Sequence, residues 1–154
     1  MGKKIKVPVF ICVCIAAIAI VGYLLIGNPF VFINNQKLKK AVQSLDTETV
    51  QLNDAVPFAW DTLYTFEPYQ SKEEIENYIG FKSAAIKENN INEGMVHLLF
   101  VKDDKVVASI LGYAANLGYS IDFSLKDEQK VSFEENARFN VTNKDGVITL
   151  TYVK

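Results

Sequence analysis

The side chains of this sequence that could do chemistry are few, and three of them are acids beside aromatic residues. Asp61 follows Trp60, Glu67 follows Phe66, and Asp122 precedes Phe123. Apolar surroundings raise the pKa of a carboxyl group, and two such groups brought together can hydrolyse a glycosidic bond. Because the pairing of acids is spatial, the sequence leaves open an envelope hydrolase that uses Asp61, Glu67 or Asp122.

Nucleophilic and metal chemistry have less support. His97 is the only histidine, and it alternates with Met95 and Leu99 on an apolar segment, which is typical of a core histidine. The only cysteines, Cys12 and Cys14, lie in an apolar run near the N-terminus, and no Gly-x-Ser-x-Gly motif occurs. A catalytic triad and a zinc site both lack the residues they need. We therefore expect no cofactor, no metal and, on balance, no enzyme.

The least generic feature is the aromatic segment around residues 60–69. Strand alternation puts Trp60, Tyr64 and Phe66 on one face, as a buried side of a sheet would have them. Core packing does not explain Tyr69, which lies in the turn that follows this strand. We therefore predict a partner surface at the turn 67–70 and the loop 112–118, where tyrosines can serve as binding anchors. The residues predicted to bind the partner are Asp61, Glu67, Tyr69, Tyr113 and Tyr119.

The N-terminal part of the chain predicts a membrane anchor. Residues 7–26 read VPVFICVCIAAIAIVGYLLI, twenty positions without a charge. A helix of that length spans about 30 Å, the thickness of the hydrocarbon core of a bilayer. The main alternative is a signal peptide cleaved at Ala17-Ile18-Ala19, which would leave an awkwardly apolar new end.

Lysines flank this run on both sides. Lys3, Lys4 and Lys6 lie closest to it and favour a cytoplasmic N-terminus with the domain outside, in a single-pass arrangement at the cell membrane. Lys37, Lys39 and Lys40 on the other side keep the reverse orientation open. Residues 27–154 hold 13 Lys and Arg against 18 Asp and Glu, a net charge of −5, so we expect no nucleic-acid partner.

The elements expected after the anchor define an α+β domain. Residues 34–45 have the spacing of an amphipathic helix, and Ser71 with Glu74 forms a capping box for a second helix that ends at Gly80. The expected strands are 60–66, 95–101, 105–111, 119–125, 138–142 and 147–153, with 49–53 and 131–133 as candidates for short additional strands. Tight turns between them predict one mainly antiparallel sheet of about five to seven strands with one or two helices packed on it.

The predicted organisation is therefore a basic N-terminus and transmembrane anchor at 1–26, a linker at 27–33, and the α+β domain at 34–154. The segments FAWDTLYTFEPYQSKEEIENYIGF and LLFVKDDKVVASI resemble a pattern in small secreted or membrane-tethered proteins of low-GC Gram-positive bacteria. The resemblance covers about residues 57–125. It implies an extracytoplasmic location and this type of domain, and it implies no activity.

Three functional hypotheses follow from the sequence. The leading one is a membrane-tethered extracytoplasmic domain that binds a protein or a component of the cell envelope and is not an enzyme. The second is the carboxylate-dependent envelope hydrolase, which would gain strong support if acids such as Asp61, Glu67 and Asp122 converged in one cleft. The third is an exclusion or immunity-type membrane protein that acts against phage, conjugation or a toxin.

Overall fold

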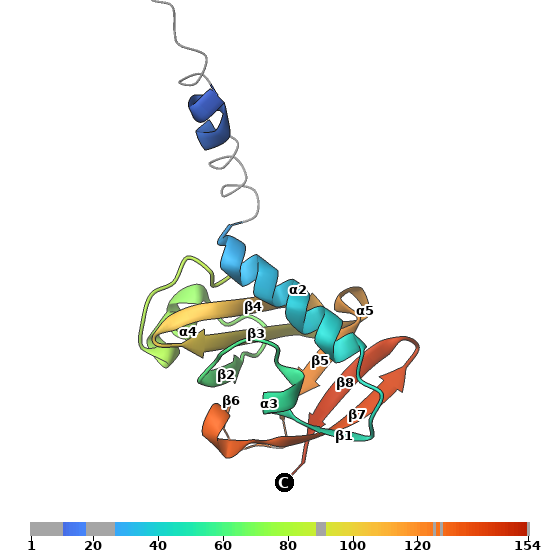
Figure 1. The fold of residues 1–154 in the computed structure, drawn as a ribbon. Coiled ribbons are helices and arrows are strands. Elements are labelled where there is room, and N and C mark those ends of the chain that lie inside the picture. Colours follow the sequence, from blue (N-terminus) through green and yellow to red (C-terminus); the bar gives the residue numbers. More distant parts are fainter. Residues whose placement is uncertain (1–10, 18–26, 89–91, 125, 127, 154) are drawn as a thin grey trace, which may run out of the picture.

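A computed structural model describes residues 11–17, 27–88, 92–124, 126 and 128–153. After a helical segment at 11–17, the helices are α2 (Pro29–Gln43), α3 (Leu52–Ala55), α4 (Lys72–Ile79), α5 (Ala114–Leu117) and the 3-10 turn η1 (Phe133–Glu135). The strands are β1 (Thr49–Gln51), β2 (Thr62–Thr65), β3 (Met95–Lys102), β4 (Lys105–Tyr113), β5 (Tyr119–Asp122), β6 (Lys130–Ser132), β7 (Arg138–Lys144) and β8 (Val147–Tyr152). The predicted α+β class is confirmed (Figure 1).

The strands form two sheets of four strands each, so the prediction of one mainly antiparallel sheet is wrong. One sheet has the order β1-β7-β8-β5 and the other has the order β4-β3-β2-β6. Strands β5 and β8 run parallel, and the other neighbours run antiparallel. Alternation of apolar residues shows which face of a strand is buried, but it does not show which strand lies beside it. The chain leaves β5 for β6 in the other sheet, returns with β7, and only then places β8 beside β5 (Figure 1).

The predicted transmembrane helix at 7–26 is also corrected. Among the described residues, no helix is long and apolar enough to cross a membrane. The described part of that run is the helical segment 11–17, which is only about 10 Å long at 1.5 Å per residue. Residues 7–10 and 18–26 lie outside the described residues. Hydropathy establishes that a run is apolar, whereas spanning needs about twenty residues in one continuous helix.

Helix α2 begins inside the segment expected to be a linker. The side chain of Asn28 accepts a hydrogen bond from the Phe30 N–H at 3.0 Å, and Pro29 occupies the first turn. An Asn-Pro pair suits the start of a helix as well as the end of a preceding one, because proline fixes φ and needs no hydrogen bond there. The domain therefore starts at the helix that Asn28 caps, and only Gly27 of the linker's described residues precedes this cap.

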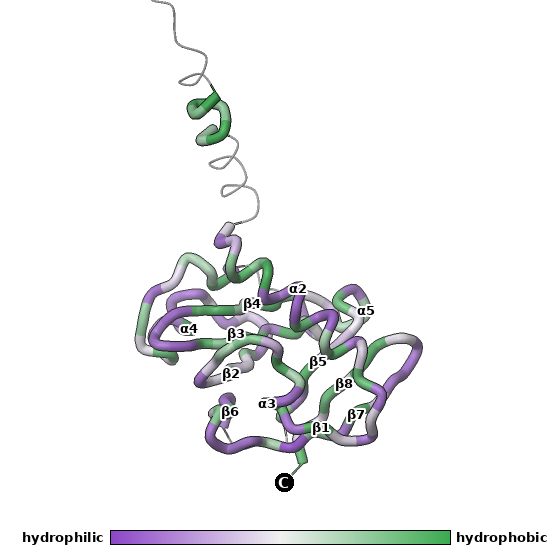
Figure 2. Tube along the Cα trace, in the orientation of Figure 1, coloured by the Kyte–Doolittle hydropathy of each residue, from purple (hydrophilic) through white to green (hydrophobic). Residues whose placement is uncertain are grey.

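Two apolar clusters hold the elements together. The larger lies between α2, α3 and both sheets and includes Leu38, Val42 and Phe100. The smaller lies on the other side of β3, where Ile75 of α4 packs with Leu99 and its neighbours. Figure 2 shows apolar and polar residues mixed along α2, as expected for a helix with one buried side. Sheet β4-β3-β2-β6 is thus buried on both of its faces over β3.

Helix α2 also closes the outer edge of β4. The amide Nδ2 of Asn34 donates to the Val107 carbonyl at 2.9 Å. Asn35 makes two bonds to Ser109: its Nδ2 donates to the Ser109 carbonyl at 2.8 Å, and its Oδ1 accepts from the Ser109 N–H at 2.9 Å. An edge strand with unpaired backbone groups is a template for unwanted pairing. The two asparagines take the place of a further strand beside β4.

We expect Asn35→Ala to lower the free energy of unfolding by about 2 kcal/mol, because it leaves both an N–H and a carbonyl of Ser109 without partners. Asn34→Ala removes one bond, so its expected loss is about half as large. Urea denaturation of the full chain measures both values. Equal effects of the two substitutions would contradict the role given to the paired bonds of Asn35.

Candidate functional site

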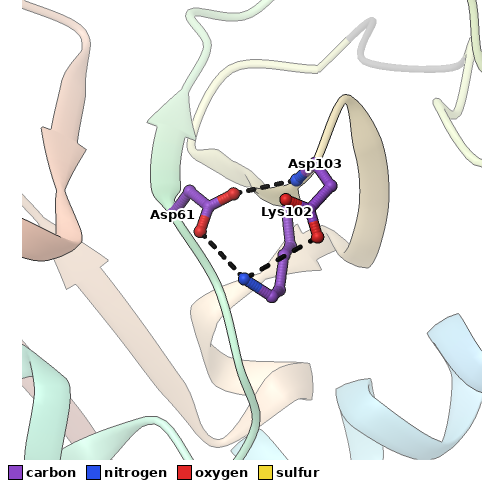
Figure 3. A network of polar contacts seen from close by, with 3 residues as sticks. All are labelled: Asp61, Lys102 and Asp103. Atoms are coloured by element: carbon purple, nitrogen blue, oxygen red, sulfur yellow. Dashed lines mark hydrogen bonds and ion pairs between the residues drawn. The ribbon is translucent and has the colours of Figure 1, made fainter.

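Asp61 holds a turn in place. Its Oδ2 accepts a hydrogen bond from the Asp103 N–H at 2.8 Å, and its Oδ1 lies 3.2 Å from Nζ of Lys102 (Figure 3). The bond from the Asp103 N–H, followed by the contact with Lys102, lowers the pKa of Asp61. Asp103 and Asp104 have positive φ values of 48° and 55°, as a tight hairpin turn requires. Asp61 therefore links the start of β2 to the β3–β4 turn.

The three acids of the hydrolase hypothesis do not converge. Asp61 precedes β2 and Glu67 follows it, so four strand residues alone separate them by roughly 13 Å at 3.3 Å per residue. Glu67 and Asp122, by contrast, line the same cleft. The described residues also contain no group of three or more His, Cys, Asp or Glu side chains that could hold a metal ion. Asp61 is thus separate from the other two acids.

The cleft that contains Glu67 and Asp122 lies where the two sheets approach each other. It has a volume of about 460 Å³ and is lined by residues 65–68, 94–97 and 120–124 together with Ala114. These segments are the end of β2, the start of β3, and β5 with the residues that follow it. We call this space the β5 cleft. Its volume lies within the usual range for ligand sites in proteins.

One wall of the β5 cleft is the outer side of β5. Strand β5 is the last in its sheet, and its only partner among the described strands is β8. The Gly118 carbonyl accepts a hydrogen bond from the Ile148 N–H at 3.1 Å, so Gly118 directs its carbonyl towards β8. Because successive residues of a strand point their backbone groups to opposite sides, Tyr119 and Ile121 direct theirs away from β8. These two residues are only 1% and 3% exposed, so the surface that β5 offers to the cleft comes mainly from Ser120 and Asp122.

The lining of the β5 cleft is acidic and partly apolar. Glu67 and Asp122 contribute carboxylates, and no Lys or Arg is among the lining residues. One oxygen of Asp122, Oδ1, accepts from the Ser124 N–H at 2.9 Å, which fixes the orientation of this carboxylate. Phe66 and Phe123 are buried beside the cleft and supply its apolar part. The site therefore offers apolar contact and negative charge together.

His97 lies at the β5 cleft but is poorly suited to acid–base catalysis. The residue is completely buried, its ring centroid is 5.5 Å from that of Phe66, and neither ring nitrogen has a hydrogen-bond partner among the described residues. Burial, with a smaller contribution from the positive charge of Lys87, lowers the pKa of His97 to about 4. A general base works best with a pKa near the working pH. The sequence-based expectation of a core histidine agrees with this burial.

The tyrosines predicted to bind a partner fall into two groups. Tyr69 is 63% exposed and directly follows Pro68, and Tyr113 is 41% exposed and directly precedes Ala114. Both are therefore chain neighbours of residues that line the β5 cleft. Tyr119 is only 1% exposed, and burial raises the pKa of its hydroxyl group. Tyr119 is thus a core residue that presents almost no surface to a partner, because its position in β5 points its side chain inward.

Tyr69 also has a strained backbone. Its φ is +70°, in the left-handed region that side chains other than glycine rarely adopt. The turn is held by the Glu67 N–H, which donates to Oε1 of Gln70 at 2.8 Å. Strain of this kind is often found at functional sites, where it orients a side chain for binding. The turn thereby keeps an exposed aromatic ring beside the cleft.

The predicted partner surface and the β5 cleft overlap in part. The turn 67–70 and the loop 112–118 lie far apart in the sequence, and the structure places residues of both at one cleft. Sequence reasoning missed the cleft itself, because its lining comes from segments that are distant in the sequence. It named Asp122 only as a possible catalytic acid. Asp61, at the other end of β2, does not belong to this site.

Comparison of the chain with protein-family models, with curated proteins and with solved structures finds no match. The functional argument therefore depends on the geometry of the site.

Proposed function

We propose that this protein is a non-enzymatic binding domain that receives an extended segment of a protein partner in the β5 cleft. The observation that carries the proposal is the β5 cleft of about 460 Å³, whose lining residues Pro68 and Ala114 have the exposed Tyr69 and Tyr113 as chain neighbours. A concave, partly apolar site with aromatic side chains at its rim is typical of a surface that binds a partner.

The surroundings of the β5 cleft support binding more than catalysis. Tyr69 and Tyr113 lie beside the cleft as exposed aromatic side chains, and tyrosine is among the residue types most enriched in energetically dominant contacts. Asp61, one of the three acids of the hydrolase hypothesis, lies at the far end of β2 and does not reach the cleft. Burial lowers the pKa of His97 to about 4, so this residue is a poor proton-transfer group at ordinary pH.

The proposal is tested by selecting peptides of about six residues, the usual length of a strand, from a random library with the full chain as bait. The backbone NMR signals of the chain then locate the bound peptide. We expect the signals of Met95 and Ser120 in the β5 cleft to shift and that of Asp145 in the β7–β8 turn to stay constant. A library without binders, or binders that leave the signals of the cleft unchanged, would overturn the proposal.

The substitution Tyr69→Gly should lower the affinity for a peptide without lowering the stability of the fold. Glycine adopts a φ of +70° without strain, so we expect the free energy of unfolding to stay constant or to rise by up to about 1 kcal/mol. Loss of the aromatic ring should weaken the affinity for a selected peptide about tenfold. Phe30→Ala is the matched control, since Phe30 is an exposed aromatic residue on α2 that does not line the cleft. An equal loss of affinity in both variants would contradict the role of Tyr69.

A further inference from the structure

We infer that the outer side of helix α2 binds the surface of an anionic phospholipid bilayer. This inference is independent of the proposed function, because it concerns a different part of the molecule from the β5 cleft. The contact is made at the surface of the bilayer, so it needs no helix that crosses the membrane. It rests on exposed apolar side chains, on exposed lysines and on the distribution of charge along the chain.

Exposed apolar side chains gather on the first turns of α2. Phe30 is 76% exposed, and Phe32 and Ile33 are each nearly half exposed. The helical segment 11–17 also exposes its large apolar side chains, Ile11, Val13 and Ile15. The other exposed large apolar side chains among the described residues are single ones in separate elements: Tyr69, Tyr78, Tyr113 and Phe133. A group of exposed apolar residues marks an interaction site, whereas scattered ones need no explanation.

Lysines follow these residues on the same side of α2. Residues spaced by three and four positions lie in one row along a helix, and one such row consists of Phe30, Ile33, Lys37 and Lys40. All four are exposed, and α2 lies on the outside of the domain (Figure 1). The buried residues of α2, which are Val31, Leu38 and Val42, lie on the opposite side of the helix. The row therefore faces away from the domain, with its apolar part first and its basic part after it.

The spacing along the helix axis suits the depth of a bilayer surface. At 1.5 Å per residue, Lys37 lies about 6 Å beyond Ile33 and about 10 Å beyond Phe30 along α2. Interfacial helices bury their apolar side chains about 5–10 Å into the boundary between the headgroups and the acyl chains. When α2 approaches with its N-terminal end first, its apolar residues reach this boundary while its lysines meet the headgroup phosphates.

The charge of the chain changes sign after α2. Residues 1–43 hold six Lys and no Asp or Glu, whereas residues 44–154 hold 10 Lys and Arg against 18 acids. An anionic bilayer therefore attracts the part of the chain that contains α2 and repels the rest of the domain. This separation turns α2 towards the lipid. It also favours a bilayer over a second copy of the chain, since two copies of α2 would bring their lysines together, and like charges at an interface are unfavourable.

Tryptophan fluorescence of the full chain tests whether the start of α2 enters the lipid. Phe30→Trp places a reporter on α2, and Tyr78→Trp places the same reporter at an exposed position of α4. Trp60 is buried, and its signal is measured in the wild-type chain and subtracted. With vesicles of phosphatidylcholine and phosphatidylglycerol, we expect the Phe30→Trp emission to shift to the blue and to be quenched by brominated acyl chains, and the Tyr78→Trp emission to stay constant. No quenching of Phe30→Trp, or equal quenching of both variants, would overturn the proposal.

Substitution of the two lysines tests the electrostatic part. We expect the double variant Lys37→Gln, Lys40→Gln to bind these vesicles about ten- to thirtyfold more weakly, because each lysine near an anionic surface contributes about fivefold. Added salt should reduce this difference. The matched control is Lys130→Gln, Lys144→Gln, which removes the same charge from exposed positions outside α2. Equal losses in the two double variants would overturn the proposal, because binding would then follow net charge and not α2.

Sedimentation of the full chain without lipid tests a second copy as the partner of this surface. We expect Phe30→Ser to weaken binding to the vesicles several-fold and to leave the sedimentation of the chain unchanged. A dimer that Phe30→Ser dissociates, together with unchanged binding to vesicles, would assign the surface to self-association and overturn the proposal.

Discussion

We expect His97→Leu to make the protein markedly less sensitive to acid. The imidazole of His97 is completely buried against Phe66 and has no hydrogen-bond partner on either nitrogen. Its protonated form must therefore exist in the core without solvation, and the charge of Lys87 opposes it further. Leucine has a similar size, needs no hydrogen bond and cannot titrate. A partnerless buried polar group is itself unfavourable, so the substitution should not reduce stability near pH 7.

The sign of the effect follows from the direction of the pKa shift. The pKa of His97 falls from 6.5 in the unfolded chain to about 4 in the folded protein. Between these values the unfolded state binds more protons than the folded state, so the free energy of unfolding decreases as the pH falls. Titration of His97 is therefore expected to lower the free energy of unfolding by about 3 kcal/mol when the pH falls from neutral to about 4.

Urea denaturation of the wild-type chain and of His97→Leu over this pH range measures the effect. Carboxyl groups titrate in both proteins, so their contribution cancels in the difference between the two curves. We expect that difference to grow towards acid pH by about 3 kcal/mol. Parallel curves would show that His97 is protonated as easily in the folded state as in the unfolded state, contrary to its burial.

The second large effect is expected for Phe100→Ala. Phe100 is completely buried in the larger apolar cluster, and its ring makes edge contacts with Phe58 at 5.4 Å and with Trp60 at 5.8 Å between centroids. Removing a buried phenylalanine ring loses its transfer free energy and leaves a cavity, which together cost about 3–5 kcal/mol. A loss of that size approaches the entire stability of many domains. Thermal and urea unfolding of the full chain measure it.

Phe133→Ala provides the control for this prediction. The Phe133 ring also makes an edge contact with Trp60, at 5.3 Å, but the residue is 45% exposed. We expect its removal to cost about 1 kcal/mol, since only the aromatic contact and part of the apolar area are lost. Both rings contact Trp60, so the difference between the two losses of unfolding free energy measures the effect of burial. Equal losses would mean that contact with Trp60, and not burial in the cluster, sets the stability.

Local signals in the sequence were sufficient for the elements whose ends they define. The Glu74 N–H donates to Oγ of Ser71 at 3.2 Å, the Ser71 N–H donates to Oε2 of Glu74 at 2.7 Å, and Gly80 ends α4 with a φ of +87°. The two-residue turn at Asp103-Asp104 joins β3 to β4 as expected. These features depend on residues within a few positions of one another, so the chain specifies them without reference to its tertiary structure.

The packing of the aromatic segment 60–66 could not be predicted from local signals. Alternation placed Trp60, Tyr64 and Phe66 on one face, yet Trp60 packs in the larger cluster and Phe66 in the smaller one, with Tyr64 against it. The regular strand begins only at Thr62, so the period of two residues does not extend back to Trp60. Where a strand starts depends on its neighbours, here β3 and β6, which are distant in the sequence.

The sequence by itself determined the α+β class, the capped helix α4, the hairpin turns and the acidic balance of residues 27–154. The tertiary structure alone decided the division into two sheets, the parallel pairing of β5 with β8, and the β5 cleft. The physical reason is the range of the interactions. Caps and turns are satisfied by nearby backbone groups, whereas strand partners and clefts form between segments that only the folded chain brings together.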